Sequence, residues 1–365
     1  MRIVHTEASC GWGGQEIRIL EESKGMIERG HDVLVLCPAE SRILAEASRW
    51  SVRAQALPIG RKNLRGFFAL RRWLASNPLD VLNTHSSTDS WLAALACATL
   101  KNSPPVVRTR HISAPIPDNA PTRWLYTKAT RHIVTTGEAL RQELIDSNGY
   151  PAAMITSIPT GIDPARFFPA DKKNSREKLG LDVSSHYIGI VATLRSWKGH
   201  LYLLDAFAQL DAPGWKLLMV GDGPMRDVLQ SRAAELGIAD RTLFPGQQQN
   251  PEDWLRALDI FCLPSYANEG VPQALVQAMM TELPIVTTPV GAIPEVVGSN
   301  AAVVIPERSA AALADAISAL INDVARRAAL GSVARREAIA RYSLVSMLDG
   351  MLKIFCSILA NNQSV

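Results

Sequence analysis

The sequence of 365 residues has few cysteines and lacks the spacings that mark metal sites. Its five cysteines lie far apart and form no Cys-x-x-Cys pair, so neither a disulfide framework nor a zinc site is indicated. No Asp-x-Asp sequence occurs and no two histidines stand at ligand spacing, so we expect no metal and no cofactor. A reducing, cytoplasmic environment fits this cysteine usage. The cysteines are Cys10, Cys37, Cys97, Cys262 and Cys356.

Long apolar runs are also missing. The nearest candidate, residues 91–100, is half the length of the roughly 20 apolar residues that a membrane-spanning helix needs. Residues 1–10 lack the apolar core and small-residue cleavage site of a secretory signal. We therefore expect neither a membrane span nor an export signal.

The chain has no large excess of either charge. With 38 Lys and Arg against 35 Asp and Glu, the formal net charge is +3, which argues against a nucleic-acid binder. The stretch 61–131 is different, because it contains eleven basic residues and only three aspartates, which gives a local charge of +8. A solvated basic surface, an anionic membrane and an acidic acceptor are the alternatives. The basic residues are Arg61, Lys62, Arg65, Arg71, Arg72, Lys101, Arg108, Arg110, Arg123, Lys128 and Arg131.

The remaining composition is that of a globular α/β protein. Short runs rich in Val, Ile and Leu alternate with amphipathic stretches, as expected for parallel sheets covered by helices on both faces. Strands are predicted at 2–7, 32–38, 52–59, 81–86, 105–110 and 132–137, and then at 187–193, 216–223, 241–246, 260–265, 284–290 and 301–306. Predicted helices include 16–29, 89–100, 309–323 and 324–360.

The length and the repeated pattern indicate two Rossmann-like domains. Pro159, Gly161, Pro164 and Pro169 interrupt the chain before a polar run, which places the boundary near residues 160–175. We assign 1–165 to the first domain and 166–344 to the second, and we expect a final helix of about 345–365 to pack back on the first.

Four turns that follow predicted strands carry the candidate site residues, because ligands of parallel sheets bind at the carboxyl ends of the strands. Gly13 and Gly14 open the first helix, and Gly221 and Gly223 end a strand of the second domain, although each pair also suits an ordinary tight turn. Arg195 and Lys198 are three residues apart and can converge on one diphosphate, although loop cations are often simply solvated.

The fourth turn brings Glu269 to the start of a helix. Pro272 suits the first helical turn, whose free N–H groups can receive phosphate or sugar oxygens. The residues expected to contact such a ligand around this turn are Gly270, Val271, Ala274, Leu275 and Gln277.

In order and spacing, these motifs resemble those of the retaining glycosyltransferases of family 4 over nearly the whole chain. The resemblance rests on residues 13–16, on His111, on residues 160–163, on Arg195 with Lys198, on residues 221–223 and on residues 269–270. It implies a GT-B fold, with two Rossmann-like domains facing across a cleft, and a nucleoside-diphosphate sugar as donor.

The resemblance also implies roles for particular residues. Arg195 and Lys198 match the cations that hold the donor diphosphate, and Glu269 matches the first acid of the family's Glu-x7-Glu motif, beside the donor sugar. His111 resembles the histidine of the first domain that contacts this sugar, and Gly13 and Gly14 look like the loop over phosphate and acceptor. The chain departs from the pattern at Gln277, where the second glutamate would accept hydrogen bonds from the ribose; glutamine keeps one acceptor but no charge.

The function implied is transfer of a sugar to a glycan or lipid-linked acceptor with retention of configuration, in bacterial surface polysaccharide or lipopolysaccharide synthesis. A sugar-nucleotide 2-epimerase of the same fold and a noncatalytic nucleotide-sugar sensor are the alternatives. The segment 60–75 combines cations with Phe67, Phe68 and Trp73, as a helix on an anionic membrane would, although packing on its own sheet is the commoner arrangement. We expect a cytoplasmic protein in which these charges guide contact with the inner face of the membrane, and no nucleic-acid partner.

Overall fold

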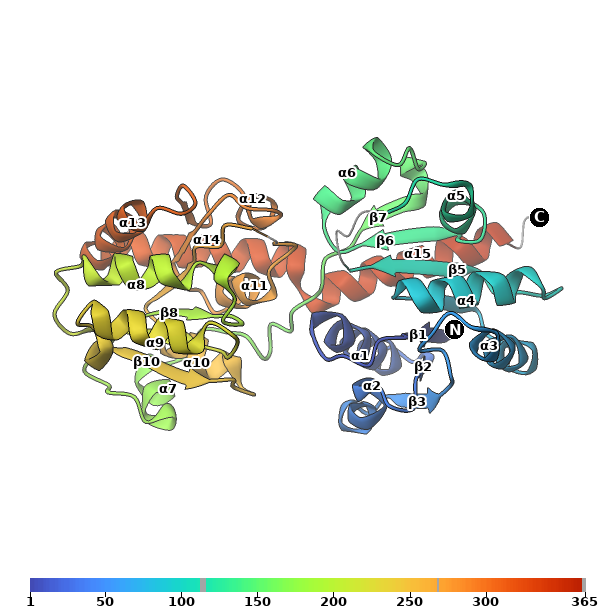
Figure 1. Cartoon of the computed structure of the whole chain (residues 1–365), viewed down its shortest axis with the longest axis horizontal. Helices are drawn as coiled ribbons and strands as arrows, with labels where there is room; N and C mark the ends of the chain where they lie inside the picture. Colours follow the sequence, from blue (N-terminus) through green and yellow to red (C-terminus); the bar gives the residue numbers. More distant parts are fainter. Residues whose placement is uncertain (112–115, 268, 363–365) are drawn as a thin grey trace. The chain divides into compact units, whose positions relative to one another are not determined.

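A computed structural model describes residues 1–111, 116–267 and 269–362 of the chain (Figure 1). The chain forms two compact units, of which unit 1 comprises Met1–Gly161 with Leu344–Val365 and unit 2 comprises Ile162–Ser343. The chain thus leaves unit 1 after Gly161 and returns at Leu344, whereas the sequence placed these points at residues 165 and 345.

Unit 1 is built on a seven-stranded sheet in the order β3-β2-β1-β4-β5-β6-β7, and all its strand pairings are parallel. Its strands are β1 (Arg2–Thr6), β2 (Asp32–Cys37), β3 (Arg53–Ala56), β4 (Val81–Thr84), β5 (Val106–Arg110), β6 (His132–Thr135) and β7 (Ile155–Ser157). Its helices are α1 (Gly14–Glu28), α2 (Arg42–Glu46), η1 (Ala47–Trp50), α3 (Leu64–Ser76), α4 (Ser87–Ala98), α5 (Ala120–Thr127), α6 (Glu138–Asp146), η2 (Ala152–Met154) and α15 (Leu344–Asn362).

Unit 2 has a six-stranded sheet in the order β10-β9-β8-β11-β12-β13, again with parallel pairings throughout. Its strands are β8 (His186–Val191), β9 (Trp215–Val220), β10 (Thr242–Gly246), β11 (Ile260–Leu263), β12 (Ile285–Thr287) and β13 (Val303–Val304). Its helices are α7 (Lys172–Leu179), η3 (Ser196–Lys198), α8 (His200–Ala208), α9 (Arg226–Glu235), η4 (Ala239–Arg241), α10 (Pro251–Ala257), α11 (Gln273–Met280), α12 (Ile293–Val297), α13 (Ala310–Asn322) and α14 (Val324–Tyr342).

The predicted α/β class with two parallel sheets is confirmed, and each of the twelve predicted strands overlaps an observed one. Two features were not predicted. The short strand β7 lies in a segment that the prolines and glycines made look like a linker. The predicted helix 324–360 is two helices, because Ser343 has extended backbone and forms a bridge with Ile162. The two points where the chain passes between the units therefore lie next to each other.

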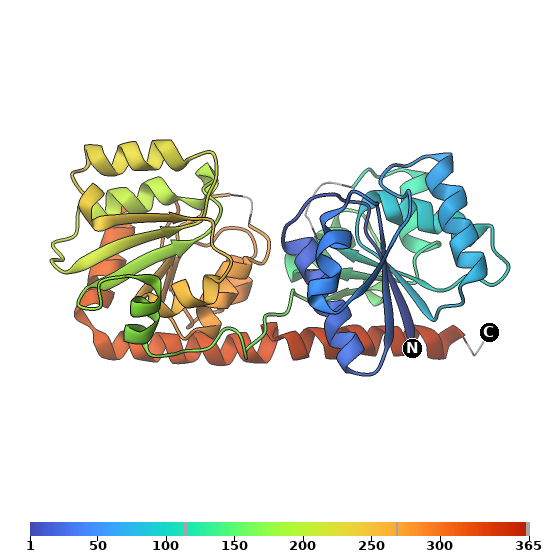
Figure 2. The same ribbon diagram turned by 90° about the horizontal axis from the view of Figure 1, so that it is seen from below.

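Helices cover both faces of the sheet in unit 1 (Figure 2), and the side chains of each central strand point alternately towards the helices on the two faces. Neighbouring residues of a strand point to opposite faces. Ile3 and Val81 pack in one cluster with residues of α1 and α15, whereas Val4 and Leu82 pack with α3 and α4. The consecutive apolar residues of β1 and β4 are thus buried on both faces of the sheet, as expected for central strands of a parallel sheet.

The last helix belongs to the core of unit 1. The side chains of Met347, Met351 and Phe355 on α15 are buried with the strands and with α1. At the solvent edge, Arg29 Nη2 lies 2.8 Å from Asp349 Oδ1. The final helix is therefore a structural part of this unit, and within the described residues no helix is long and apolar enough to cross a membrane.

In unit 2, a buried carboxylate ties α7 to the start of two strands. Asp259, which precedes β11, accepts hydrogen bonds from Arg176 Nη2 at 2.7 Å, from Lys172 Nζ at 2.8 Å and from the Tyr187 N–H at 2.9 Å. Burial opposes ionisation of Asp259, but the charge of Lys172 and these hydrogen bonds outweigh it and lower the pKa of the carboxyl group. The carboxylate therefore remains charged in the folded protein at neutral pH.

We expect Asp259→Asn to lower the free energy of unfolding by about 3 to 5 kcal/mol, because it leaves the buried Arg176 guanidinium without its counter-charge. Urea unfolding at pH 7 measures this loss. Asp182→Asn is the matched control, since Asp182 also contacts a lysine, Lys216, but on the surface. Equal stability of Asp259→Asn and the unmodified protein would contradict the assignment.

Candidate functional site

Each sheet has one position where a crevice is expected at the carboxyl edge of its strands. In unit 1, β1 lies between β2 and β4, and in unit 2, β8 lies between β9 and β11. At such a reversal of strand order, the helices that follow the two central strands pack on opposite faces and leave a space between their N-termini. The loops after β1, β4, β8 and β11 are therefore where a ligand site is expected.

In unit 2, these two loops are joined by an ion pair. Lys198 stands at the end of η3, in the turn after β8, and Glu269 lies in the loop after β11. Lys198 Nζ donates to both carboxylate oxygens of Glu269, at 2.8 and 2.9 Å. The Ser265 hydroxyl also donates to this carboxylate. The side chain of Glu269 is 3% exposed and that of Lys198 is 20% exposed, so the lysine covers the acid on the solvent side.

Backbone contacts fix the position of Glu269. The Tyr266 N–H donates to the Trp197 carbonyl at 2.9 Å, which links the two loops directly. Gly291 approaches from the other side with a φ of +57°, and a Cβ on it would lie 1.9 Å from the Glu269 carbonyl oxygen. Only glycine fits there, because any side chain would collide with this backbone. Neither Ser265 nor Gly291 was predicted from the sequence.

Arg195 has a different environment from Lys198. Its side chain is exposed, its guanidinium carbon lies 5.7 Å from the centre of the Trp197 ring, and the described residues place no carboxylate within ion-pair distance of it. The structure therefore places both predicted cations in the turn after β8, with Lys198 already paired and Arg195 open to solvent.

Gly221 and Gly223 lie in the neighbouring loop after β9. Gly221 has a φ of +141°, and a Cβ on it would lie 2.0 Å from the Ala192 carbonyl oxygen. This glycine lets the loop after β9 touch the turn that carries the two cations. The Leu194 N–H donates to the Asp222 carbonyl at 3.0 Å, which holds the same two segments together.

The predicted donor-binding residues in and just before α11 fall into two groups. Gly270 is exposed, and Val271, Ala274 and Gln277 are partly exposed at the start and along one side of the helix. Leu275 differs, because its side chain lies in the core and its N–H donates to the Pro272 carbonyl at 3.1 Å. Its predicted contact with a ligand does not fit this arrangement, because the side chain is buried and the N–H is already hydrogen-bonded.

In unit 1, Gly13 caps the N-terminus of α1 with extended backbone, and Gly14 is the first residue of that helix. Next to this turn lies a carboxyl group that the sequence analysis missed. Glu7, directly after β1, accepts hydrogen bonds from the Ser9 N–H at 2.7 Å and from the Gln15 side chain. Burial, with a further contribution from the charge of Asp89, raises the pKa of Glu7 to about 8.

His111 is the last member of a row of three histidines. His5 Nδ1 lies 2.9 Å from His85 Nε2, and His85 Nδ1 lies 2.9 Å from His111 Nε2. His5 is on β1, His85 follows β4 and His111 follows β5. Burial lowers the pKa of His5 to about 3 and holds the pKa values of His85 and His111 well below their usual range, so all three rings are neutral at pH 7.

The row favours one set of tautomers. His5 Nε2 is buried without a hydrogen-bond partner among the described residues, and after burial the charge of Arg18 is the second cause that lowers the pKa of His5. A lone pair on Nε2 suits this cation better than an N–H. The proton of His5 then sits on Nδ1 and is donated to His85, and His85 in turn donates to His111 Nε2. His111 keeps its own proton on Nδ1.

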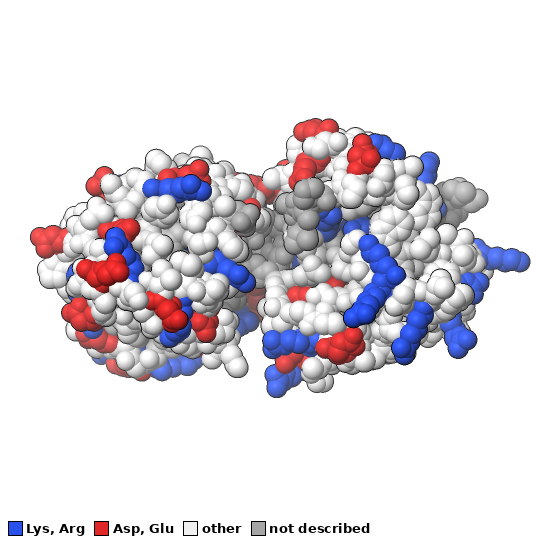
Figure 3. All heavy atoms as spheres, viewed as in Figure 1, with Lys and Arg blue, Asp and Glu red and all other residues white. Residues whose placement is uncertain are grey.

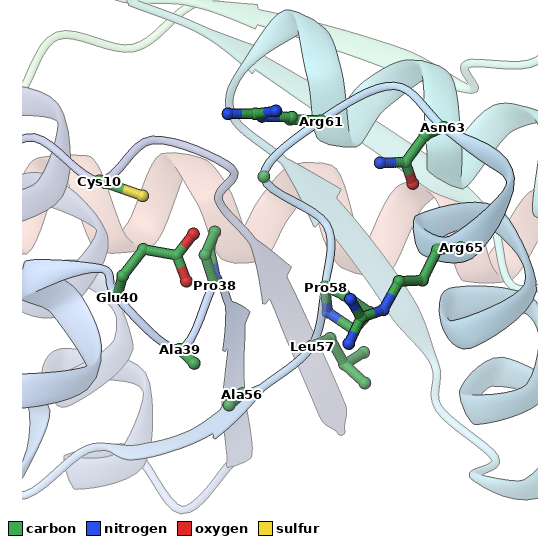
Figure 4. A pocket seen from close by; sticks show the side chains of 11 residues that line it. Cys10, Pro38, Ala39, Glu40, Ala56, Leu57, Pro58, Arg61, Asn63 and Arg65 are labelled. Atoms are coloured by element: carbon green, nitrogen blue, oxygen red, sulfur yellow. The ribbon is translucent and has the colours of Figure 1, made fainter.

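Two hollows lie near these loops of unit 1. One, of about 310 Å³, includes His85, Arg108 and His111 in its lining. The other, of about 640 Å³, lies beyond the ends of β1, β2 and β3. In Figure 4, Cys10 and Glu40 stand on one side of this larger hollow, and Arg61 and Asn63 come from the segment leading into α3 on the other. In the described part of the chain, no group of three or more His, Cys, Asp or Glu side chains forms a metal site.

Comparison with known proteins gives two family matches. The model described as Glycosyltransferase Family 4 matches residues 12–166, and the model described as Glycosyl transferases group 1 matches residues 171–337. Together they span most of both units.

Two relatives and one solved structure are examples of the proteins that are similar to the chain. The lipopolysaccharide core biosynthesis mannosyltransferase LpsB of Rhizobium meliloti is 35% identical over 51% of this chain and 57% of its own length. An Escherichia coli protein, UDP-Gal:alpha-D-GlcNAc-diphosphoundecaprenol alpha-1,3-galactosyltransferase, is 27% identical over 79% of each chain. Anabaena HepE, solved in complex with UDP, superimposes with a TM-score of 0.84 over 98% of this chain and 100% of its own at 20% identity, which confirms the predicted GT-B fold.

The histidine row makes the stability of unit 1 depend on pH. In the unfolded chain these histidines titrate near 6.5, above their pKa values in the folded protein. Below pH 6.5 the unfolded chain therefore binds protons that the folded chain does not, and the free energy of unfolding falls as the pH falls. His85→Gln removes one of these protons. We expect the stability advantage of the unmodified protein over this variant to shrink by up to about 1.4 kcal/mol per pH unit below 6.5.

Urea unfolding of both proteins at several pH values between 7 and 4.5 measures this difference. The raised pKa of Glu7 acts in the opposite sense, because the folded protein then binds the extra proton as the pH falls below 8. That contribution is common to both proteins and cancels in the comparison. Parallel pH curves would contradict a neutral, buried His85.

Proposed function

This chain belongs to the group 1 glycosyltransferases, and from that premise we propose that it transfers a sugar from a nucleoside-diphosphate sugar to a glycan or lipid-linked acceptor, with retention of configuration. The names of the relatives support the substrate classes, because the E. coli protein uses a UDP-sugar and a diphosphoundecaprenol-linked acceptor. The names of the R. meliloti and E. coli relatives also support a role in lipopolysaccharide or surface polysaccharide synthesis.

The observation that carries the proposal is the Lys198–Glu269 pair at the strand-order reversal of unit 2. We assign the donor to this unit, with its pyrophosphate beside Lys198 and the exposed Arg195. Two cations and the positive end of the α11 helix dipole stabilise the negative charge that develops on the pyrophosphate as the glycosidic bond breaks. Glu269 lies beside the donor sugar, and the loop with Gly221 and Gly223 borders the nucleotide.

Gln277 takes the place next to the ribose in this proposal. Its amide oxygen can accept one hydrogen bond from a ribose hydroxyl without adding a charge. In unit 1, which we assign to the acceptor, neutral His111 offers an uncharged N–H to a sugar hydroxyl, and the turn with Gly13 and Gly14 borders the reacting groups. With retention, the acceptor attacks on the face that the pyrophosphate leaves, and a departing phosphate oxygen takes the acceptor proton.

Independence from metal ions is a further part of the proposal. In metal-dependent enzymes a divalent cation offsets the charge of the diphosphate. Here Arg195, Lys198 and the helix N-terminus would do this electrostatic work. Transfer should therefore continue at an unchanged rate in the presence of EDTA.

We expect Lys198→Ala to lower kcat/KM for transfer by a factor of roughly 30 to 1000, because losing a charge-assisted contact to the pyrophosphate costs on the order of 2 to 4 kcal/mol of transition-state stabilisation. Nucleotide sugars are first screened for thermal stabilisation of the protein to find the donor. Lys216→Ala, which removes a surface lysine of the same unit, serves as the matched control and should retain full activity.

Lys198 also neutralises Glu269, so a loss of activity needs to be separated from a loss of folding. The double variant Lys198→Ala, Glu269→Gln removes both charges together and should regain stability without regaining activity. Near-normal turnover of Lys198→Ala would show that the pyrophosphate lies elsewhere. NMR of the product should show the anomeric configuration of the donor, and conversion of the nucleotide sugar to its epimer without acceptor would point to an epimerase instead.

Contact with an anionic membrane is also part of the proposal. Lys and Arg side chains gather over the part of unit 1 where α3 and α4 lie (Figure 3). The helix α3 buries Leu70, Trp73 and Leu74 against its own sheet, as expected for a packed amphipathic helix. Its first turns nevertheless leave two large apolar side chains outside, Leu64 at 73% exposed and Phe68 at 60% exposed. Cations beside exposed apolar side chains favour an anionic bilayer surface.

We expect the chain to sediment with vesicles that contain anionic lipid, and the double variant Leu64→Ser, Phe68→Ser to lose most of this binding because it removes the apolar contact. Co-sedimentation with vesicles of neutral and of mixed anionic composition measures it. The pair Val183→Ser, Val228→Ser, on exposed positions of unit 2, is the control. Binding that is independent of anionic lipid would remove this part of the proposal.

A further inference from the structure

The smaller hollow of unit 1 has a lining of unusual charge. The described residues that line it include Lys62, Arg108 and Arg110, together with His85 and His111. No Asp or Glu occurs among the described lining residues. They come from the segment before α3, from the end of β5 and from the loops after β4 and β5. Its volume of about 310 Å³ is at the small end for ligand pockets, enough for one small group.

Arg108 is the residue that makes this hollow more than a solvated basic surface. It is only 5% exposed, yet its Nη1 has no hydrogen-bond partner within the described residues. Its guanidinium carbon lies 4.5 Å from the centre of the Tyr126 ring. Burial lowers the pKa of Arg108, but a guanidinium group does not give up its proton in a protein. A buried charge with an unused donor is costly unless an acceptor meets it.

The nearby carboxylate does not meet this need. Asp89 lowers the cost of the Arg108 charge from a distance, but its oxygens already accept four hydrogen bonds. These come from the Thr6 hydroxyl, from the N–H groups of His85 and Ser86 and from the Ser86 hydroxyl. Because these bonds hold Asp89 in the capping box at the start of α4, where Ser86 is the N-cap, Asp89 stays bound there rather than to Arg108.

A second cation borders the same hollow. Lys62 Nζ donates to the Ser87 hydroxyl at 3.1 Å and lies 5.9 Å from the centre of the Trp91 ring. Partial burial lowers the pKa of Lys62, and the charge of Arg108 lowers it further. Two like charges that repel across a pocket are relieved together by one anion between them.

Aromatic rings complete the walls. Trp91 and Tyr126 line the hollow, and the Tyr126 hydroxyl accepts a hydrogen bond from Arg110 Nη1 at 3.0 Å. Large planar side chains that keep a polar edge suit a ligand with both apolar and polar faces, and a sugar ring has both. The lining thus combines cations for an anion with flat surfaces for a pyranose.

We propose that this hollow binds a sugar residue of the acceptor that carries one anionic group, a carboxylate or a phosphate, with Arg108 and Lys62 holding the anion and Trp91 beside the ring. The inference rests on the proposed transferase function and specifies the acceptor. It also bears on the basic stretch 61–131, for which a solvated surface, an anionic membrane and an acidic acceptor were the alternatives. Arg108 is buried and lines a pocket, so for this residue the inference favours the acidic acceptor.

The test uses the full chain and three sugars, glucuronic acid, glucose 1-phosphate and glucose, with binding followed by saturation-transfer NMR. We expect at least one of the two anionic sugars to bind roughly 10- to 100-fold more tightly than glucose, the range for a hydrogen bond to a charged group. Preference for glucuronic acid identifies a carboxylate, and preference for glucose 1-phosphate identifies a phosphate. Equal affinity for all three sugars overturns the proposal.

Two variants locate the site. Lys62→Met should weaken binding of the preferred anionic sugar about 10-fold, and since Lys62 is exposed, the variant should fold normally. Arg108→Met should abolish the preference for an anion over glucose. Lys101→Met, which removes an exposed cation outside the lining, should change nothing. Unchanged binding by Lys62→Met, or a loss as large in Lys101→Met, overturns the assignment.

Binding of UDP and GDP, measured on the same samples, separates this inference from the proposed function. A protein that binds one of these nucleotides and shows no preference among the three sugars keeps its donor function and loses the anionic acceptor. A protein that prefers an anionic sugar but binds no nucleotide keeps the pocket and loses the transferase proposal.

Discussion

The parallel direction of the strands is the constraint on which both candidate sites depend. Because every described strand pairing is parallel, the strands of each sheet end at one edge, and the loops that follow them meet there. In unit 2 this edge brings together Lys198 and Glu269, which are 71 residues apart in the sequence. In unit 1 it brings His5, His85 and His111 into one row. Connections between neighbouring parallel strands are long, so such partners are necessarily distant along the chain.

The two sites differ in how their buried ionisable groups are stabilised. In unit 2, Glu269 is buried, its charge is paired with that of Lys198, and it accepts a hydrogen bond from Ser265. In unit 1, burial raises the pKa of Glu7 to about 8 and keeps the histidines neutral, whereas the buried guanidinium groups of Arg18 and Arg108 stay charged. Arg108 cannot lose its proton and lies close to groups that are neutral, and its unused donor is the reason for proposing a ligand there.

Much of this could be predicted from the sequence, because apolar runs and turn residues are local signals. They gave twelve strands, the two parallel sheets and the turns with Arg195, Lys198 and Glu269. The short strand β7 was missed because three residues between a 3-10 turn and prolines carry too little pattern. Pairing of Lys198 with Glu269, the row that ends at His111 and the unused donor of Arg108 depend on contacts between distant segments, and no spacing in the sequence encodes them. Leu275 was predicted to contact a ligand because the sequence indicates its position near the start of a helix but does not indicate that its side chain is buried.

The charges around Glu269 bear on how a nucleotide would enter unit 2. A lone carboxylate at that point would repel a pyrophosphate, and in a buried site such repulsion is poorly screened. Because Lys198 binds both oxygens of Glu269, the pair is close to neutral overall, and Arg195 provides the net positive charge. Gln277, on the helix α11 that follows Glu269, is uncharged at the position where the family pattern has an acid. The site therefore carries less negative charge than a site with the second glutamate of the family pattern. An anionic nucleotide would be attracted mainly by Arg195, because there is no second carboxylate whose charge has to be offset.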